Sequence, residues 1–251
     1  MEVRKTKSSP VEKIGTSLFH HLLDKRTLLN PKEEVKYLLH RLIFIAYISP
    51  ELADKRDLGA HYEQLYQKLQ QFYQGDGVTG LLLIYPSYVV HTIESSSDVL
   101  FSVLRDLRNM QEHRNRTLIV DPKILVMSHD IPNRLFQQWS YKVLKLPART
   151  LVDKSHREPT EKLVSESLTL LLRLGTYLLR TPKCDNSSKT PPDSILDKVP
   201  ELIIPQDTIG DLLEREELLS SQKYLETYDS PLNIVMDSER VWPPSEHLGP
   251  I

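Results

Sequence analysis

Residues 78–93 read VTGLLLIYPSYVVHTI, and this stretch decides the fold of the 251-residue chain. Two apolar runs, at 78–85 and 88–93, are separated by Pro86-Ser87, a pair of residues that favours a turn between strands. We therefore predict an antiparallel hairpin here. The hairpin lies between two segments with helical periodicity, so it fixes the order of the elements around it.

Apolar residues recur at steps of three and four on both sides of the hairpin. The helix before it is predicted to end near the glycines at 75–77, with an inward face of Leu58, Tyr62, Leu65, Leu69 and Phe72. The helix after it can be capped by Ser96 or Ser97. Its predicted inward face is Val99, Leu100, Val103, Leu104, Leu107 and Met110.

Three more apolar segments, at 38–48, 124–127 and around 138–144, are predicted strands. The order strand, helix, strand, strand, helix, strand, strand indicates an α+β fold. It is the ferredoxin-like plan with one added strand and both helices on one face of a mixed sheet. A leucine-rich helix at 160–180 is predicted to cover the opposite face. Its apolar groups surround much of its circumference, so we expect it to make a second contact.

Charge and proline content divide the chain into four segments. Residues 182–251 hold 6 of the 32 Lys+Arg but 14 of the 34 Asp+Glu, and 9 of the 17 prolines. We predict an N-terminal extension at 1–37, a folded body at 38–181, a flexible linker at 182–200 and an acidic tail at 201–251. The tail is predicted to form a single amphipathic helix at 207–226 and to bind a protein partner; the alternative is that it packs back on its own folded body. The candidate partner-binding residues are Leu212, Leu213, Leu219 and Trp242.

The composition excludes several classes of protein. A net charge of −2 argues against a generally basic nucleic-acid binder. The single cysteine, Cys184, rules out an internal disulfide framework. The longest apolar stretch, 163–179, contains Glu166 and Arg173, which makes a membrane span unfavourable. The first residues lack the pattern of a secretion signal, so we expect a cytoplasmic protein.

The short motifs of enzymes and metal sites are missing or misplaced. Gly75, Gly77 and Gly80 form a G-x-G-x-x-G string. A dinucleotide site needs that string between a strand and a following helix, whereas here a helix precedes it and a strand follows. We interpret it as a helix end and a strand entry. The nine histidines show no metal-binding spacing, and G-x-S-x-G is absent. We expect neither a metal site nor an enzyme.

A series of motifs at 45–140 occurs in a recognisable order. They are IAYIS at 45–49, DL at 57–58, GVTGLLL at 77–83, IE at 93–94, LVMSHDI at 125–131 and RLFQQWS at 134–140. In order and spacing they resemble the BLUF family of flavin-binding blue-light sensors. The resemblance covers residues 38–146 and implies the same ferredoxin-like fold.

The resemblance also implies a set of flavin-site positions. The family uses a Tyr, an Asn and a Gln around the flavin ring, and the matching positions are Tyr47, Tyr73 and His91. Trp139 matches a tryptophan common in the family, and Tyr141 stands where a Met is frequent. An imidazole lacks the paired donor and acceptor of an amide, and a phenol at position 73 would intrude on the ring. We therefore expect no flavin and a protein-interaction role. The alternative is a flavin-binding sensor in which His91 replaces the usual Gln.

Overall fold

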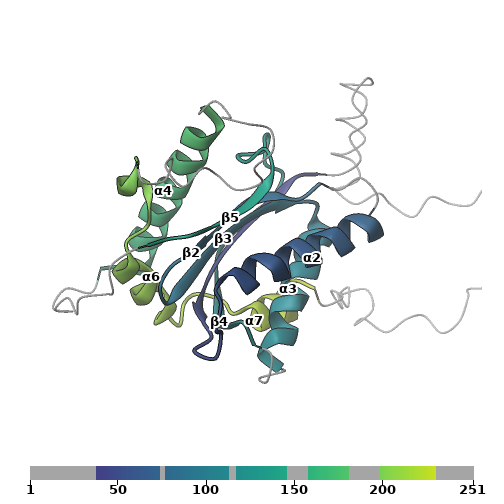
Figure 1. Cartoon of the computed structure of the whole chain (residues 1–251), viewed down its shortest axis with the longest axis horizontal. Helices are drawn as coiled ribbons and strands as arrows, with labels where there is room; N and C mark the ends of the chain where they lie inside the picture. The colour runs from purple at the N-terminus through teal and green to yellow at the C-terminus, as the bar shows by residue number, and fades with distance from the viewer. Residues whose placement is uncertain (1–37, 74–76, 113–116, 146–157, 181–197, 230–251) are drawn as a thin grey trace, which may run out of the picture.

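The computed structural model describes residues 38–73, 77–112, 117–145, 158–180 and 198–229. These residues form a five-stranded mixed sheet with helices on both faces (Figure 1). The strand order is β4-β1-β3-β2-β5. The strands are β1 (His40–Ile48), β2 (Thr79–Ile84), β3 (Tyr88–Ser95), β4 (Ile119–Ser128) and β5 (Trp139–Val143).

The predicted hairpin is confirmed as β2 and β3. The central strand β3 pairs antiparallel with β1 and β2, and β1 pairs antiparallel with β4. With two intervening helices this is the ferredoxin-like plan. The added strand β5 lies parallel to β2 at one edge. Strand β4 begins earlier than predicted because the pairing runs through an irregularity at Asp121, whose φ is 48°.

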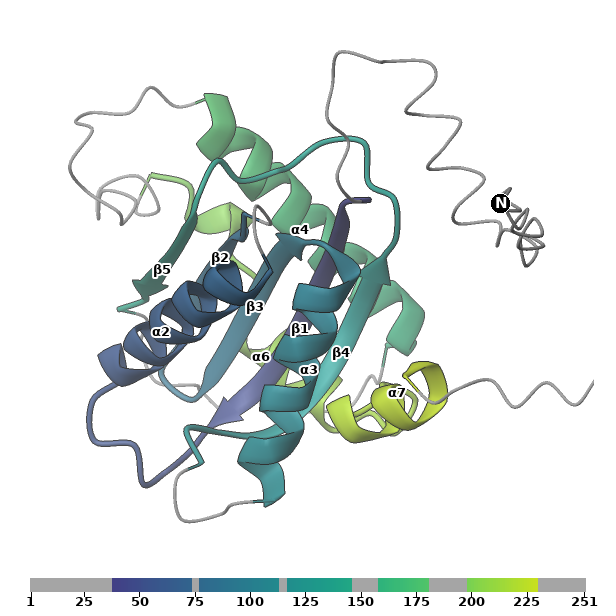
Figure 2. The same cartoon turned by 90° about the vertical axis from the view of Figure 1, so that its right-hand side faces the viewer.

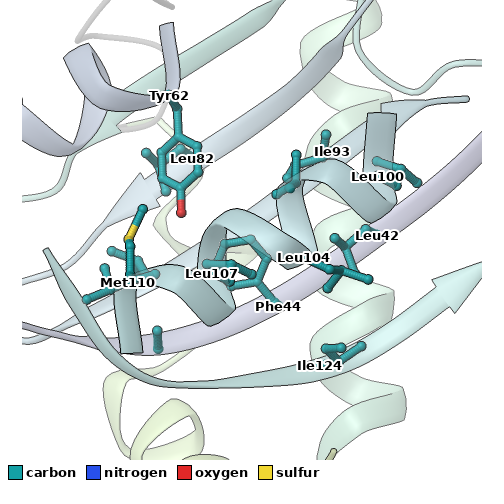
Figure 3. Packing of buried hydrophobic residues seen from close by; sticks show 14 of the residues in the cluster. Leu42, Phe44, Tyr62, Leu82, Ile93, Leu100, Leu104, Leu107, Met110 and Ile124 are labelled. Atoms are coloured by element: carbon teal, nitrogen blue, oxygen red, sulfur yellow. The ribbon is translucent and has the colours of Figure 1, made fainter. Parts of the chain in front are cut away.

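One face of the sheet is covered by α2 (Arg56–Phe72) and α3 (Ser97–Glu112), as Figure 2 shows. All six residues predicted for the inward face of α3 are buried. On α2 the prediction is wrong at Phe72, which is 77% exposed. The buried face of α2 is centred on Tyr62 and Tyr66 and has turned away from Phe72 at the last helical residue. Figure 3 shows Tyr62 pointing from α2 into the apolar cluster.

The opposite face is covered by α4 (Thr160–Arg180) and α6 (Gln206–Leu213). The predicted helix at 160–180 is confirmed, and it buries Leu163, Leu171 and Leu174 against the sheet. Figure 1 shows α4 on the far side of the sheet from α2 and α3. The fold therefore has three layers, with apolar side chains buried on both faces of the sheet.

The single tail helix predicted at 207–226 is wrong. The tail instead forms a short 3-10 turn, η2 (Pro200–Leu202), then α6, and then α7 (Ser221–Tyr228). The helix α6 packs on the α4 side, whereas α7 packs on the α3 side and beside β4. Between them, the backbone N–H of Ile124 donates to the carbonyl of Leu219 at 2.8 Å. The apolar residues of the tail pack on opposite faces of the sheet, so one straight helix could not bury them all.

The proposed partner-binding residues of the tail pack on their own chain. Leu212 and Leu213 are buried in the core beneath α4, and Leu219 packs against the core on the α3 side. The assignment of Leu212 and Leu213 to an outside partner is corrected because both side chains are buried, and Leu219 is partly buried against the core. Trp242 lies outside the described residues, as do the extension at 1–37 and most of the predicted linker. The end of that linker packs on the folded body, since the side chain of Val199 is buried.

Candidate functional site

An aromatic cluster lies beneath α2, on the face of the sheet that α3 shares. It consists of Tyr62 and Tyr66 of α2, His91 of β3, and Trp139 and Tyr141 of β5. The His91 ring lies 4.5 Å from the Tyr62 ring, and the Trp139 ring lies 5.3 Å from the Tyr66 ring, centroid to centroid. Both pairs are edge to face, an arrangement that aromatic rings favour. The rings of Tyr62, Tyr66 and Trp139 all lie next to the ring of His91.

His91 is fully buried and accepts hydrogen bonds through one ring nitrogen. The indole N–H of Trp139 donates to His91 Nε2 at 2.9 Å, and the Tyr66 hydroxyl lies 3.2 Å from the same nitrogen. An indole nitrogen can only donate, so Nε2 carries no proton and the proton of the neutral ring sits on Nδ1. Burial, with a smaller effect of His61, lowers the pKa of His91 from 6.5 to about 3. The ring is therefore neutral at physiological pH.

Two polar atoms of the cluster have no hydrogen-bond partner among the described residues. They are Nδ1 of His91 and the hydroxyl oxygen of Tyr62. Burial also raises the pKa of Tyr62 and of Tyr66 well above 10, so both phenols stay protonated. Tyr62, Tyr66 and His91 are therefore all uncharged near neutral pH.

Two polar bridges join α2 to α3 across the groove between them. His61 Nε2 of α2 lies 2.9 Å from Asp106 Oδ2 of α3. The hydroxyl of Tyr73, at the end of α2, lies 3.2 Å from the Ser102 hydroxyl of α3. The polar side chains of these two pairs are thus bonded to one another across the space between α2 and α3.

The ring of Tyr141 lies directly against the backbone of α2. A Cβ atom placed on Gly59 would meet that ring at 2.6 Å. Glycine at position 59 is what allows the aromatic ring and the helix to approach this closely. The space between α2 and β5 is therefore filled by a side chain of the protein itself.

A buried carboxylate fixes the loop that delivers Trp139 to the cluster. Glu94 of β3 is fully buried and forms an ion pair with Arg41 of β1. Its oxygens also accept from the Thr79 hydroxyl at 2.9 Å and from the backbone N–H groups of Leu135 and Phe136. Bonds to the charged form from every side offset the cost of burying it. The loop before β5 is thereby held against β3.

The flavin-site positions inferred from the BLUF resemblance divide between the two faces of the sheet. Tyr73, His91, Trp139 and Tyr141 all contact the core under α2 and α3. Tyr47 does not join them. Phe44 is the residue of β1 that pairs with His91, and side chains alternate along a strand, so Tyr47 points to the α4 side. There its ring packs on Tyr88 at 5.6 Å. The implied grouping of all five residues around one ligand is corrected.

Sequence reasoning missed the polar half of this site. Tyr62 was predicted only as a core residue, and Tyr66, His61 and Asp106 were not predicted to contribute. A signal was present, since His61, Tyr62 and Tyr66 put three hydrogen-bonding side chains within six consecutive residues of one helix. Among the described residues, no group of three His, Cys, Asp or Glu side chains could hold a metal ion. No helix in the described ranges is long and apolar enough for a membrane span.

Comparison with known families gives one match that spans most of the chain. The family model of testis-expressed protein 47 matches residues 38–230. The matched region begins just before β1 and ends just after α7, so it contains every element described above. The C-terminal helices are thus part of the family's own domain.

Similar solved structures are BLUF proteins, the family that the sequence motifs resemble. One is BlrB, a BLUF protein in its dark state, with 18% identity, 43% of this chain and 73% of that chain covered, and a TM-score of 0.32. Another is Klebsiella pneumoniae BlrP1 with FMN and cyclic diGMP. It is 19% identical, the match covers 43% of this chain and 26% of that chain, and the TM-score is 0.32. A third is BlsA in its photo-activated state. It is 15% identical, the match covers 71% of this chain and 97% of that chain, and the TM-score is 0.31. This chain spans about a quarter of the length of the BlrP1 chain it matches.

Proposed function

Because the chain belongs to the testis-expressed protein 47 family, we propose that it is a non-catalytic, BLUF-like interaction module of male germ cells. In this proposal it binds protein partners, has lost flavin photochemistry, and works in the cytoplasm or sperm flagellum as an axoneme-associated subunit. The family's name motivates the tissue. The loss of flavin is argued from the geometry of the aromatic cluster.

The observation that carries the proposal is that the groove between α2 and α3 is bridged by the protein's own side chains. A planar ring entering this groove would have to separate His61 from Asp106 and Tyr73 from Ser102, which are in hydrogen-bond contact. Each separation leaves polar groups that must find new partners. The residues present do not fit a flavin.

The hydrogen-bond chemistry of His91 supports the same conclusion. A ring-binding amide offers a donor and an acceptor side by side, whereas His91 already uses Nε2 to accept from Trp139. Tyr47, the remaining residue expected beside a flavin, lies on the other face of the sheet. The alternative function, a flavin sensor in which His91 replaces Gln, would require both residues to rearrange.

The proposal is tested on the full chain purified from cells that make flavin. We expect a colourless protein without flavin absorption in the visible range. A stoichiometric flavin that survives gel filtration would overturn the proposal in favour of the sensor. As a matched variant, Tyr73→Asn with His91→Gln restores the family's residue types, and we expect it to stay colourless because Tyr47 still faces the other side.

The location is tested separately in sperm. Antibodies against the chain should stain the flagellum and should follow the axoneme when membranes are removed with detergent. Staining that is lost with the detergent-soluble fraction would contradict an axonemal role and leave only the interaction module.

A further inference from the structure

The helix α4 carries a second, outward stripe besides the face it buries. The stripe consists of Ser165, Thr169, Leu172, Thr176 and Leu179, spaced by four, three, four and three residues. This is the spacing of a helix seam that packs against another helix. Leu172 and Leu179 are 42% and 41% exposed, unusual for large apolar residues here. All five residues of the stripe are exposed in the described structure.

The stripe is more apolar than its composition indicates. The Thr169 hydroxyl donates to the carbonyl of Ser165, and the Thr176 hydroxyl donates to the carbonyl of Leu172, both at 2.8 Å. Each hydroxyl is thus bonded to the preceding turn of its own helix. The methyl groups of the two threonines therefore remain available for an outside contact, beside two exposed leucines.

Charge is distributed unequally along the same face. Glu166 lies in the first half of α4, within 3.8 Å of Lys162. Arg173 and Arg180 lie in the second half, beside a shallow hollow of about 400 Å³ lined also by Thr169, Leu172, Thr176 and Tyr177. An acidic first half and a basic second half complement each other when two such helices run in opposite directions.

We propose that α4 is a homodimer interface in which the stripes of two copies pack antiparallel about a two-fold axis at Leu172. In this register Leu172 meets itself, Thr169 meets Thr176, and Ser165 meets Leu179. Glu166 of one copy lies between Arg173 and Arg180 of the other. A register centred on Thr176 would instead bring Arg173 beside Arg180 of the second copy, so charge favours the first.

This inference rests on the proposed function, for which it names a second copy of the chain as one partner. It also accounts for the two leucines of α4 that its contacts with the sheet, η2 and α6 leave exposed. A self-complementary patch is what a two-fold dimer requires.

The oligomeric state of the full chain tests the interface. We expect a dimer in sedimentation equilibrium, and Leu172→Glu should weaken it by about tenfold or more because two carboxylates then meet on the axis. The control is Val120→Glu on β4, where the replaced residue is similarly exposed at 38%. That variant should remain dimeric. Thermal unfolding of the monomeric variant shows whether the fold itself is intact.

Charge reversal tests the register. Glu166→Arg and Arg180→Glu should each weaken the dimer, and the two together in one chain should restore it because the pairs are regenerated with opposite sign. Failure of the double variant to recover dimerisation, while each single variant is folded, would overturn the antiparallel register.

Cross-linking tests the direction in a Cys184→Ser background. Leu172→Cys should form a disulfide with its own copy under mild oxidation. Ser165→Cys should not, because the two positions are 14 residues apart along the antiparallel pair, about 21 Å. It should cross-link only when mixed with a chain carrying Leu179→Cys. Self-linking of Ser165→Cys would indicate a parallel pair and contradict the inference.

The outcomes separate this inference from the proposed function. A monomeric wild-type chain, or a dimer unaffected by Leu172→Glu, overturns the interface and leaves the flavin-free module standing. A dimer that responds as described but binds flavin supports the interface and overturns the flavin-free module.

Discussion

Trp139 and His91 form one hydrogen-bonded unit across two strands that are not neighbours. The indole N–H donates to His91 Nε2 at 2.9 Å, and β2 lies between β3 and β5 in the sheet. The bond therefore crosses over a whole strand on the α2 side. It fixes the tautomer of a buried histidine and the position of the edge strand at the same time.

The first prediction concerns this bond. Trp139→Phe should lower the free energy of unfolding by about 1–3 kcal/mol, because it removes the donor and leaves Nε2 buried with only Tyr66. Trp139→Ala should cost about 3 kcal/mol or more, since it also removes a large packed ring. Urea denaturation measures both. If the alanine variant melts like wild type, the packing described for β5 is wrong.

The second prediction is a pH dependence from His91. Its pKa is about 3 in the folded chain and about 6.5 when unfolded, so the unfolded chain binds the extra proton first as pH falls. The contribution of neutral His91 to the free energy of unfolding is therefore fully present above pH 6.5. It falls by about 1.4 kcal/mol per pH unit between about pH 6 and pH 4. His91→Gln should remove this component of the slope. Phe72→Gln, an exposed control, should keep it; an unchanged slope in His91→Gln would contradict the assignment.

The third prediction concerns the C-terminal helices. The side chains of Leu225 and Tyr224 are buried, and Arg105 of α3 holds Asp229 through paired bonds of 2.9–3.1 Å. We therefore expect trypsin to spare the bond after Lys223 in the folded chain. Mass spectrometry of a limited digest gives the answer. Early cleavage there would mean that α7 detaches from α3.

The fourth prediction tests the packing of α6. Leu212→Ala should lower the free energy of unfolding by about 2–5 kcal/mol, because Leu212 is fully buried between the sheet and its covering helices. Tyr228→Ala, at an exposed site, should change it by about 0.5 kcal/mol or less. Equal effects of the two variants would contradict the placement of α6 in the core.

The fifth prediction concerns Glu94. Glu94→Gln keeps the shape of the side chain but removes the charge that balances Arg41 inside the sheet. We expect the free energy of unfolding to fall by about 3–5 kcal/mol, as it does when one partner of a buried ion pair is removed. The double variant Glu94→Gln with Arg41→Met should recover part of that loss. No recovery would indicate that the bonds to the loop N–H groups, and not the ion pair, dominate.

The helix α3 was predictable in full because one segment, with a serine at its start and a regular period, serves a single face. The tail was not predictable in the same way. The spacing of its apolar residues is compatible with one helix, and only the folded sheet shows that they pack on two different faces; these residues are Ile209, Leu212, Leu213 and Leu219. Side-chain pattern alone cannot tell which layer a residue will reach when the chain crosses an edge.

The candidate site shows a limit of a different kind. The motifs locate Tyr47 and His91 along their strands, but the face each side chain occupies depends on register. An offset of one residue between paired strands moves a side chain to the other face. The pairing of His91 with Phe44 places Tyr47 on the α4 side. Nor could the sequence reveal the bridges from α2 to α3, since they join residues 29 and 45 positions apart.

The central claim is that the groove between α2 and α3 is closed to a flavin by its own side chains. Thermal unfolding of the full chain in rising concentrations of FMN and of FAD tests it most directly, because any ligand that binds the folded state raises the unfolding temperature. We predict an unfolding temperature that does not change with either flavin. A saturable, concentration-dependent rise, abolished by substituting His91, would contradict the claim.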